Sequence, residues 1–158
     1  MGAYAEEPTY VGGIGLLLDR VTASLVKEFE DATAEWKLRN LHLGILSTIE
    51  RFGPLPQVRI GEYLGIERQT MANLVDDLER LGYVERTRDP NDRRVWAVTI
   101  TATGRAIRAD AVAAGSARGR IMFERLDADE QRQLEQLLLK LAAGGKYPYL
   151  FVDPVNGD

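Results

Sequence analysis

Over residues 57–100 the hydrophobic spacing changes from a helical period to a strand period, and this change restricts the possible folds more than any other feature. The spacing predicts two short helices and then two strands, at about 57–64, 67–81, 83–88 and 95–100. Gly65 separates the helices, and Asp89-Pro90-Asn91-Asp92 lies between the strands, with proline where a type I turn favours it. We therefore expect a tight turn between the helices and a β-hairpin directly after them.

Amphipathic helices are also predicted on both sides of this segment. Two precede it, at about 11–33 and 38–51, and two follow it, at about 102–125 and 128–142. Thr101 is well placed to be the N-cap of the first helix after the hairpin. That helix is rich in alanine and glycine, which permits another helix to approach closely. The predicted fold class is mainly α with a small β-hairpin, in a chain of 158 residues that has the length of about one domain.

Composition excludes several classes of function. The sequence has no cysteine, which rules out disulfides, zinc ribbons and thiol chemistry. We find no apolar stretch of the ~18 to 20 residues that span a bilayer, and no basic region that begins a signal peptide. We therefore expect a soluble, cytoplasmic protein without a membrane partner.

The charge distribution is uneven along the chain. The net charge of −4 alone argues against a nucleic-acid partner, but residues 53–108 hold nine arginines, no lysine and eight acids. Arginine suits phosphates and base edges because its guanidinium is a rigid, planar fork. The charge arithmetic therefore leaves nucleic-acid binding open.

Two short helices followed by a hairpin with an Asp92-Arg93-Arg94 tip have the order of a winged helix-turn-helix. The second helix of such a unit enters the major groove, and its exposed face here carries Arg68, Gln69 and Asn73. These side chains can form hydrogen bonds with bases or phosphates. A hairpin beside that helix can reach the adjacent minor groove, where arginine is attracted by the negative potential.

Four segments in the same order carry a resemblance to a known family. They are Leu64-Gly65-Ile66, Asn73-Leu74-Val75-Asp76-Asp77-Leu78-Glu79-Arg80-Leu81-Gly82-Tyr83-Val84, Asp89-Pro90-Asn91-Asp92-Arg93-Arg94, and Ile100-Thr101-Ala102-Thr103-Gly104. Together they resemble the MarR-type (multiple antibiotic resistance regulator) winged helix-turn-helix transcriptional regulators. In that family the recognition helix ends in Leu-Glu-x-x-Gly-hydrophobic-Val, a wing with Asp-x-Arg follows, and Leu-Thr-x-x-Gly opens the next helix. The resemblance is densest over residues 53–104.

The resemblance implies a single MarR-like domain over residues 1–158. It implies a DNA-reading head at 53–101 and a helical dimerisation region formed by 11–35 and 102–158. It further implies a homodimer that recognises a pseudo-palindromic operator in double-stranded DNA, usually as a repressor. A small anionic, often aromatic, effector would bind between the two regions, and no other cofactor is implied.

Transferred position by position, the resemblance assigns DNA-facing positions in the recognition helix and the wing. These are Glu67, Arg68, Gln69, Ala72, Asn73, Asp92, Arg93 and Arg94. In this assignment Arg94 is the wing arginine, Asp92 orients it and Arg93 contacts a phosphate. The chain departs from the family pattern at Glu67, where Ser or Thr is favoured, and at Asn73 and Asp77, where basic residues are common.

Several other residues have a structural interpretation beside the functional one. Asp76 and Arg80 are predicted to form a surface ion pair one helical turn apart, and Trp96 is predicted to fill the core under the wing. His42, the only histidine, lies near Trp36 and Arg39 in sequence. With Arg20 from the first helix, these three side chains are candidates to bind an aromatic carboxylate, against a purely structural role.

Two alternative functions are weighed against a DNA-binding regulator. A winged-helix protein-interaction module without DNA binding is suggested by Glu67, Asp77 and the negative net charge. A small enzyme is the other alternative, but the sequence contains no recognisable set of acid, base and nucleophile and no metal-ligand cluster. The expectation is therefore no catalytic and no metal site. The tail at 144–158 is too apolar for a free linker, and its role is not assigned.

Overall fold

The computed structural model describes residues 12–89 and 92–143 of the chain. Its elements follow in chain order: α1 (Ile14–Ala32), the 3-10 helix η1 (Ala34–Trp36), α2 (Asn40–Phe52), β1 (Leu55–Pro56), α3 (Gln57–Leu64), α4 (Arg68–Arg80), β2 (Val84–Arg88), β3 (Trp96–Ile100), α5 (Ala102–Phe123) and α6 (Ala128–Ala143). The predicted fold class, mainly α with a hairpin wing, is confirmed.

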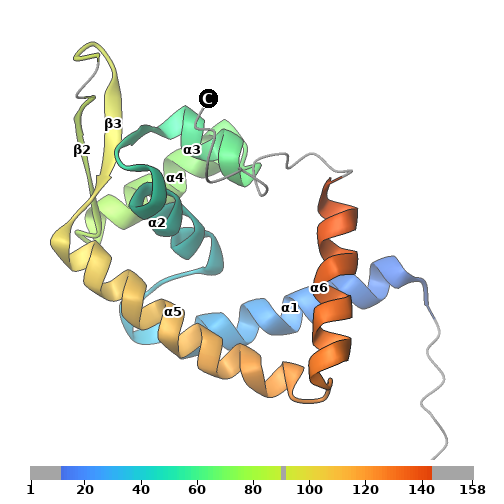
Figure 1. The fold of residues 1–158 in the computed structure, drawn as a ribbon. Helices are drawn as coiled ribbons and strands as arrows, with labels where there is room; N and C mark the ends of the chain where they lie inside the picture. Colours follow the sequence, from blue (N-terminus) through green and yellow to red (C-terminus); the bar gives the residue numbers. More distant parts are fainter. Residues whose placement is uncertain (1–11, 90–91, 144–158) are drawn as a thin grey trace, which may run out of the picture.

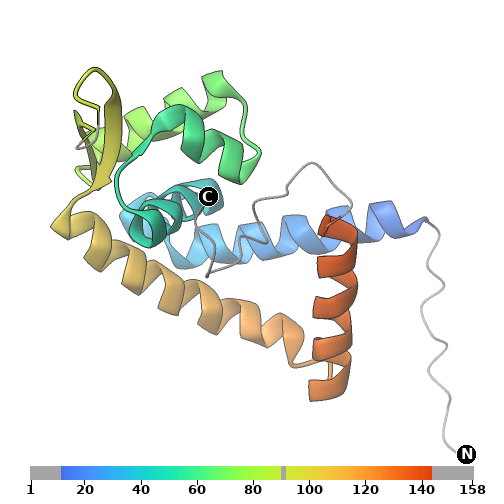
Figure 2. The same ribbon diagram turned by 45° about the horizontal axis from the view of Figure 1, so that its top comes forward.

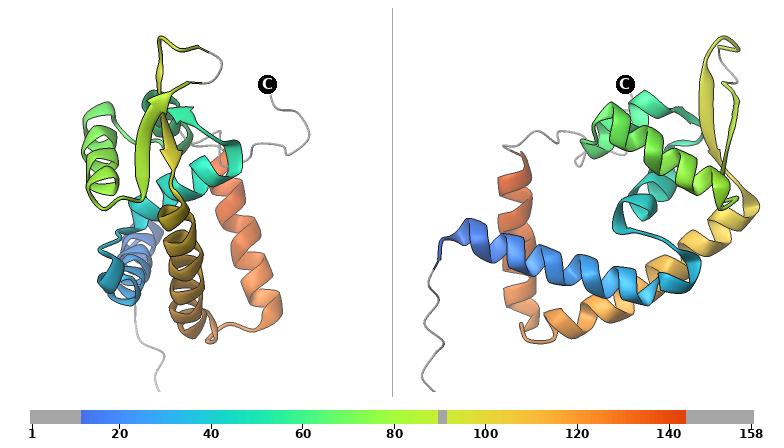
Figure 3. Two further views of the ribbon diagram at one scale, coloured as in Figure 1. Left: turned by 90° about the vertical axis from the view of Figure 1, so that its left-hand side faces the viewer. Right: turned by 180° about the vertical axis from the view of Figure 1, so that it is seen from behind.

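The elements divide into a compact head and a set of long helices (Figure 1). Helices α2, α3 and α4 pack with the sheet to form the head, and α5 leads away from the sheet alongside α1. Figure 2 shows the same separation from another direction, with α6 standing apart from the head. The ribbon of β2 and β3 extends beyond the helices of the head in both views of Figure 3.

The core of the head joins α2 to the two helices and the hairpin that follow it. Its largest fully buried side chains come from α2, α3, α4, β2 and β3, namely Ile45, Leu46, Ile49, Ile60, Met71, Leu74, Val75, Leu78, Val84 and Val98. The apolar residues of α2 thus pack in the same core as α4, although α2 precedes the head predicted at 53–101. This continuity ties the position of α4 to that of α2.

The sheet has three strands in the order β1-β3-β2, with both pairs antiparallel. In the hairpin Val84 pairs with Ile100 and Arg88 pairs with Trp96. Strand β1 was not predicted from the sequence, because it is only two residues long and ends in Pro56. Proline donates no hydrogen bond, and it is tolerated here because β1 is at the edge of the sheet.

Two predictions about side chains are wrong. Trp96 is 54% exposed and stacks under the Arg88 guanidinium, 4.0 Å from the ring centroid, instead of filling the core. Val98 and Ile100 on the same strand are at most 4% exposed and belong to the core of the head, so only the start of β3 leaves this face in solvent. Asp76 forms its ion pair with Arg86 on β2, not with Arg80.

Thr101 is the N-cap of α5, as predicted, and it fastens this helix to the head. Its hydroxyl accepts a hydrogen bond from the Gly104 amide at 3.0 Å and donates one to the Gly82 carbonyl at 2.7 Å. A Cβ atom on Gly104 would lie 2.0 Å from the Tyr83 carbonyl oxygen, so this contact requires glycine. Further along α5, a Cβ on Gly115 would lie 2.6 Å from the Phe29 ring, which confirms the predicted close helix approach.

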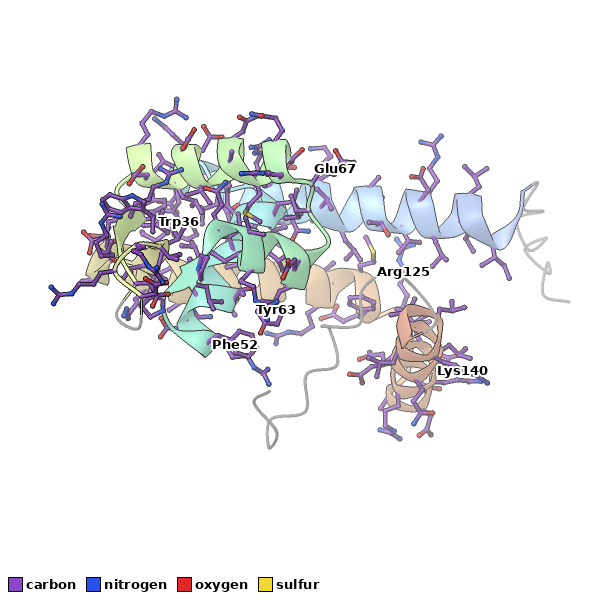
Figure 4. All side chains as sticks on the ribbon, turned by 90° about the horizontal axis from the view of Figure 1, so that it is seen from above. Trp36, Phe52, Tyr63, Glu67, Arg125 and Lys140 are labelled. Carbon is purple, nitrogen blue, oxygen red and sulfur yellow. The ribbon has the colours of Figure 1, made fainter. Side chains whose placement is uncertain are left out.

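Large apolar side chains are exposed on α1 and α6. On α1 they are Ile14, Leu16, Leu17, Leu18 and Val21, and on α6 they are Leu137, Leu138, Leu139 and Leu141. None of residues 128–142 in α6 is buried in the single chain. Figure 4, which labels Lys140 on α6, shows the side chains of this helix spreading to all sides of it, with the helix set apart from the head. The tail at 144–158 lies outside the described residues.

Candidate nucleic-acid interface

Helix α4 divides into a buried face and an exposed polar face. Met71, Leu74, Val75 and Leu78 are spaced to form one stripe, and each is at most 1% exposed. Burying this stripe against α2 and α3 leaves the opposite face in solvent. The turn before α4 is made by Gly65, whose φ of 64° is a left-handed conformation that glycine adopts without strain.

The exposed face of α4 carries the side chains predicted to read DNA. Arg68, Gln69 and Asn73 are exposed, and Ala72 between them is half-buried. The Gln69 side-chain amide donates to the Asn73 amide oxygen at 3.2 Å, so the two amides form a flat hydrogen-bonding group. Glu67 is the N-cap residue but its side chain forms no capping hydrogen bond. Figure 4 shows it at the turn between α3 and α4.

The wing presents an arginine held in a fixed orientation. The Arg94 Nε and Nη2 atoms donate to the two carboxylate oxygens of Asp92 at 3.0 and 3.1 Å. These side-chain hydrogen bonds, followed by one from the Arg94 amide, hold the pKa of Asp92 below its ordinary value. The Arg94 side chain remains 91% exposed, and Arg93 beside it is also exposed. The ion pair therefore orients a cation without removing it from solvent.

Arg86 connects the wing to α4, a contact that is not predicted from the sequence. Its guanidinium lies 2.5 Å from the Asp76 carboxylate and forms a second ion pair with Glu79, both on α4. The Arg86 amide also donates to Glu79 Oε1 at 3.2 Å. One signal for this contact is present in the sequence, because Asp76 and Glu79 lie three residues apart and this spacing places both on one face of a helix. Arg86 fixes the hairpin and α4 as one unit.

Asp77 faces away from the exposed polar residues of α4 and toward the start of α2. Its carboxylate forms ion pairs with Arg39, at 3.2 Å, and with Arg80. Because these two guanidiniums balance its charge, Asp77 does not place an unpaired negative charge beside the exposed face of α4.

The structure brings only part of the predicted effector group together. Arg39 and His42 line one cavity of about 500 Å³, whereas Arg20 lines another, of about 710 Å³, between α1 and α5. Trp36 is half-buried, and its carbonyl accepts a hydrogen bond from the Tyr83 hydroxyl. Burial, then the nearby charge of Arg39, lowers the pKa of His42 to about 4, and Asp77 opposes this shift.

The described ranges 12–89 and 92–143 lack two other kinds of feature. They contain no group of three or more His, Asp or Glu side chains arranged to hold a metal ion. No helix within these ranges is both long enough and apolar enough to cross a membrane.

Comparison with known proteins gives consistent matches. The model of the MarR family matches residues 37–95, from the approach to α2 through the end of the wing turn. The uncharacterized HTH-type transcriptional regulator YwhA of Bacillus subtilis is 28% identical over 116 residues, or 73% of this chain and 84% of YwhA. The HTH-type transcriptional repressor Rv2887 of Mycobacterium tuberculosis is 28% identical over 130 residues, or 82% of this chain and 94% of that protein.

Solved structures agree with the sequence matches. The transcriptional repressor CouR bound to a 23-mer DNA duplex is similar with a TM-score of 0.76 and 26% identity, over 85% of this chain and 99% of CouR. CouR bound to p-coumaroyl-CoA is similar with a TM-score of 0.75 and 25% identity, over 82% of this chain and 91% of CouR. The similarity thus extends beyond the head to the helices on both sides of it.

Proposed function

We propose that this chain is a DNA-binding transcriptional regulator of the MarR family, and that it acts as a homodimeric repressor released by a small anionic effector. The observation that carries the proposal is that α4 and the wing both expose polar side chains suited to DNA and are held together as one unit. Arg68, Gln69 and Asn73 are exposed on one element, and Arg94 is held by Asp92 on the other. Arg86 joins the two elements, so both reading surfaces move together.

We propose base and phosphate contacts in this arrangement. The N-terminal part of α4, from Glu67 to Asn73, enters the major groove, and Arg94 reaches the adjacent minor groove. Arg93 contacts a phosphate beside it. As a DNA-binding repressor the protein acts in the cytoplasm, where a bacterial operator lies.

The dimer is supported by the exposed leucines of α6 and the apolar side chains of α1. Leu137 and Leu141 are 53% and 63% exposed in the single chain, and Ile14 on α1 is 77% exposed. Exposed apolar side chains gathered on a helix in this way mark an interaction site. We propose that residues 11–35 and 102–158 form the dimer interface and that 53–101 reads one half-site. A two-fold dimer then recognises half-sites about one helical turn apart.

The relatives support the proposals that this chain represses transcription and that a small effector releases it from DNA. Rv2887 is named a repressor, and CouR has been solved both with DNA and with p-coumaroyl-CoA. We propose that the effector binds more tightly to a dimer whose heads are wrongly spaced for the operator than to the dimer that fits it. Operator affinity then falls by the difference between these two binding free energies.

Fluorescence anisotropy with the DNA that flanks the gene tests the proposal. Binding must weaken as salt rises, with a slope of log affinity against log salt of about −0.9 for each neutralised phosphate. Unlabelled duplex of scrambled sequence must compete less well than the flanking DNA. A flat salt dependence, or equal competition by the scrambled duplex, would instead favour the winged-helix interaction module without DNA binding.

A further inference from the structure

An open cavity lies between the start of α2 and the end of α4, apart from the DNA-facing side of the head. It has a volume of about 500 Å³ and is lined by Lys37, Arg39, His42, Asp77, Arg80 and Leu81. Three of these side chains are cationic and one is anionic, in a chain whose net charge is −4. The cavity is therefore a local concentration of positive charge.

His42 presents a hydrogen-bond donor to this cavity. Its Nδ1 accepts a hydrogen bond from the Arg39 amide at 3.1 Å, so Nδ1 is unprotonated and the neutral ring carries its proton on Nε2. The side chain is only 3% exposed, yet Nε2 has no hydrogen-bond partner among the described residues. A buried donor without a partner destabilises the fold, and an acceptor that reaches it removes that cost.

Asp77 shows which kind of acceptor fits. Its carboxylate lies between the guanidiniums of Arg39 and Arg80, and its Oδ2 is 3.8 Å from His42 Nε2, too far for a hydrogen bond. The position between the two guanidiniums thus suits a planar anion with two oxygens. The Asp77 backbone on α4 holds this carboxylate short of the His42 donor, a restriction that a diffusible carboxylate does not have.

We propose that this cavity binds a small organic carboxylate, which replaces the Asp77 carboxylate on Arg39 and accepts a hydrogen bond from His42 Nε2. Leu81 provides an apolar wall for the body of the ligand, and Lys37 adds a further positive charge. The inference rests on the proposed function, because it gives the effector a location and a mode of binding.

The same replacement changes the link between α2 and the recognition helix. The Arg39–Asp77 ion pair connects residues 38 positions apart, one before α2 and one on α4. A ligand carboxylate that takes Arg39 breaks this link and leaves Asp77 paired with Arg80 on its own helix. The ligand therefore favours a conformation of the head in which α4 is no longer held to the start of α2.

Benzoate titrations test the inference, with benzamide as the uncharged analogue and inorganic phosphate as the alternative anion. The NMR signal of the His42 ring proton Hε1 reports the site directly, because His42 is the only histidine. We expect benzoate to shift this signal saturably, and benzamide and phosphate to shift it much less. Calorimetry on the same samples gives the dissociation constant.

Variants of the two charged partners separate the proposed site from other sites. Asp77→Asn removes the internal competitor, so benzoate should bind about tenfold more tightly, whereas Arg39→Gln should abolish binding. Lys27→Gln is the matched control, because it removes a cation that is 73% exposed and pairs within α1. The inference is overturned if Asp77→Asn binds benzoate no better than the wild type, if Arg39→Gln binds it equally well, or if phosphate competes equally.

Operator binding distinguishes failure of the site from failure of the proposed function. If benzoate lowers operator affinity equally in the wild type and in Arg39→Gln, the effector site lies elsewhere and this inference fails while the proposed function stands. If benzoate binds as described but leaves operator affinity unchanged, the site stands and the release mechanism of the proposed function fails.

Discussion

Acidification should destabilise the folded chain through His42, and His42→Gln should remove this effect. The imidazole is 2% exposed and neutral in the folded state, where its pKa is lowered to about 4 mainly by burial. The nearby charge of Arg39 also disfavours protonation of the ring, and the charge of Asp77 favours it. In the unfolded chain the same ring has an ordinary pKa of about 6.5.

The direction and the size of the change in the free energy of unfolding follow from these two pKa values. Between about pH 6.5 and about pH 4 the unfolded state binds the proton and the folded state does not, so the free energy of unfolding falls as the pH falls. Each unit of pKa difference corresponds to about 1.36 kcal/mol. Lowering the pH from about 8 to about 5 should therefore cost about 2 kcal/mol, and the full loss below pH 4 is about 3 kcal/mol.

Urea denaturation at a fixed protein concentration measures this contribution. His42→Gln is the matched variant, because its side-chain oxygen can accept the hydrogen bond from the Arg39 amide while the residue does not titrate. Carboxylates titrate in both proteins, so the wild type should lose about 2 kcal/mol more than the variant between about pH 8 and about pH 5. Parallel pH profiles for the two proteins, or a His42 Hε1 titration with a midpoint near 6.5, would refute the burial of a neutral imidazole.

Three further predictions concern the wing and its junction with α5. Arg94→Ala should weaken operator binding several-fold, or about 1 kcal/mol, in an anisotropy titration at fixed salt. Arg94→Lys should still bind the operator less tightly than the wild type, because lysine lacks the planar fork that pairs with Asp92. Trp96→Ala should lower the free energy of unfolding in urea by less than about 1 kcal/mol. Ile100→Ala on the same strand should lower it by about 2–5 kcal/mol, because Ile100 is only 4% exposed. Equal losses would contradict the exposed position of Trp96. Gly104→Ala should destabilise the fold by about 1–3 kcal/mol or more, because its Cβ would overlap the Tyr83 carbonyl, and a circular dichroism melting curve that matches the wild type would rule out this contact.

The elements with a strong local signal could be predicted from the sequence. Helix α3 was expected at 57–64 and spans those residues, and Thr101 caps α5 as expected. Both depend on neighbours in sequence, such as the helical spacing of apolar residues and a capping hydroxyl. The small residues of α5 likewise indicated the close packing that Gly115 makes with Phe29.

Features that depend on distant residues could not be predicted. Strand β1 exists because Leu55 and Pro56 meet β3, which lies some forty residues later in the chain. The sequence did not indicate that the hairpin extends past the helices, so Trp96 was assigned to the core on spacing alone. The ion-pair partner of Asp76 could not be predicted either. Asp76 lies one helical turn from Arg80, but it pairs with Arg86 on β2, which only the tertiary fold brings close.

The acidity of α4 has a structural explanation, although at the level of sequence Asp77, with Glu67 and the negative net charge, suggested a module without DNA binding. The C-terminal half of α4 carries three acids, and each is paired with an arginine: Asp76 and Glu79 with Arg86, and Asp77 with Arg39 and Arg80. These pairs use cations of the head to fix α4, β2 and the start of α2 relative to one another. They also leave few arginines to bind phosphate, so operator affinity should depend steeply on individual residues such as Arg94. A regulator built in this way gains little from non-specific attraction and must obtain its affinity from the fixed geometry of α4 and the wing.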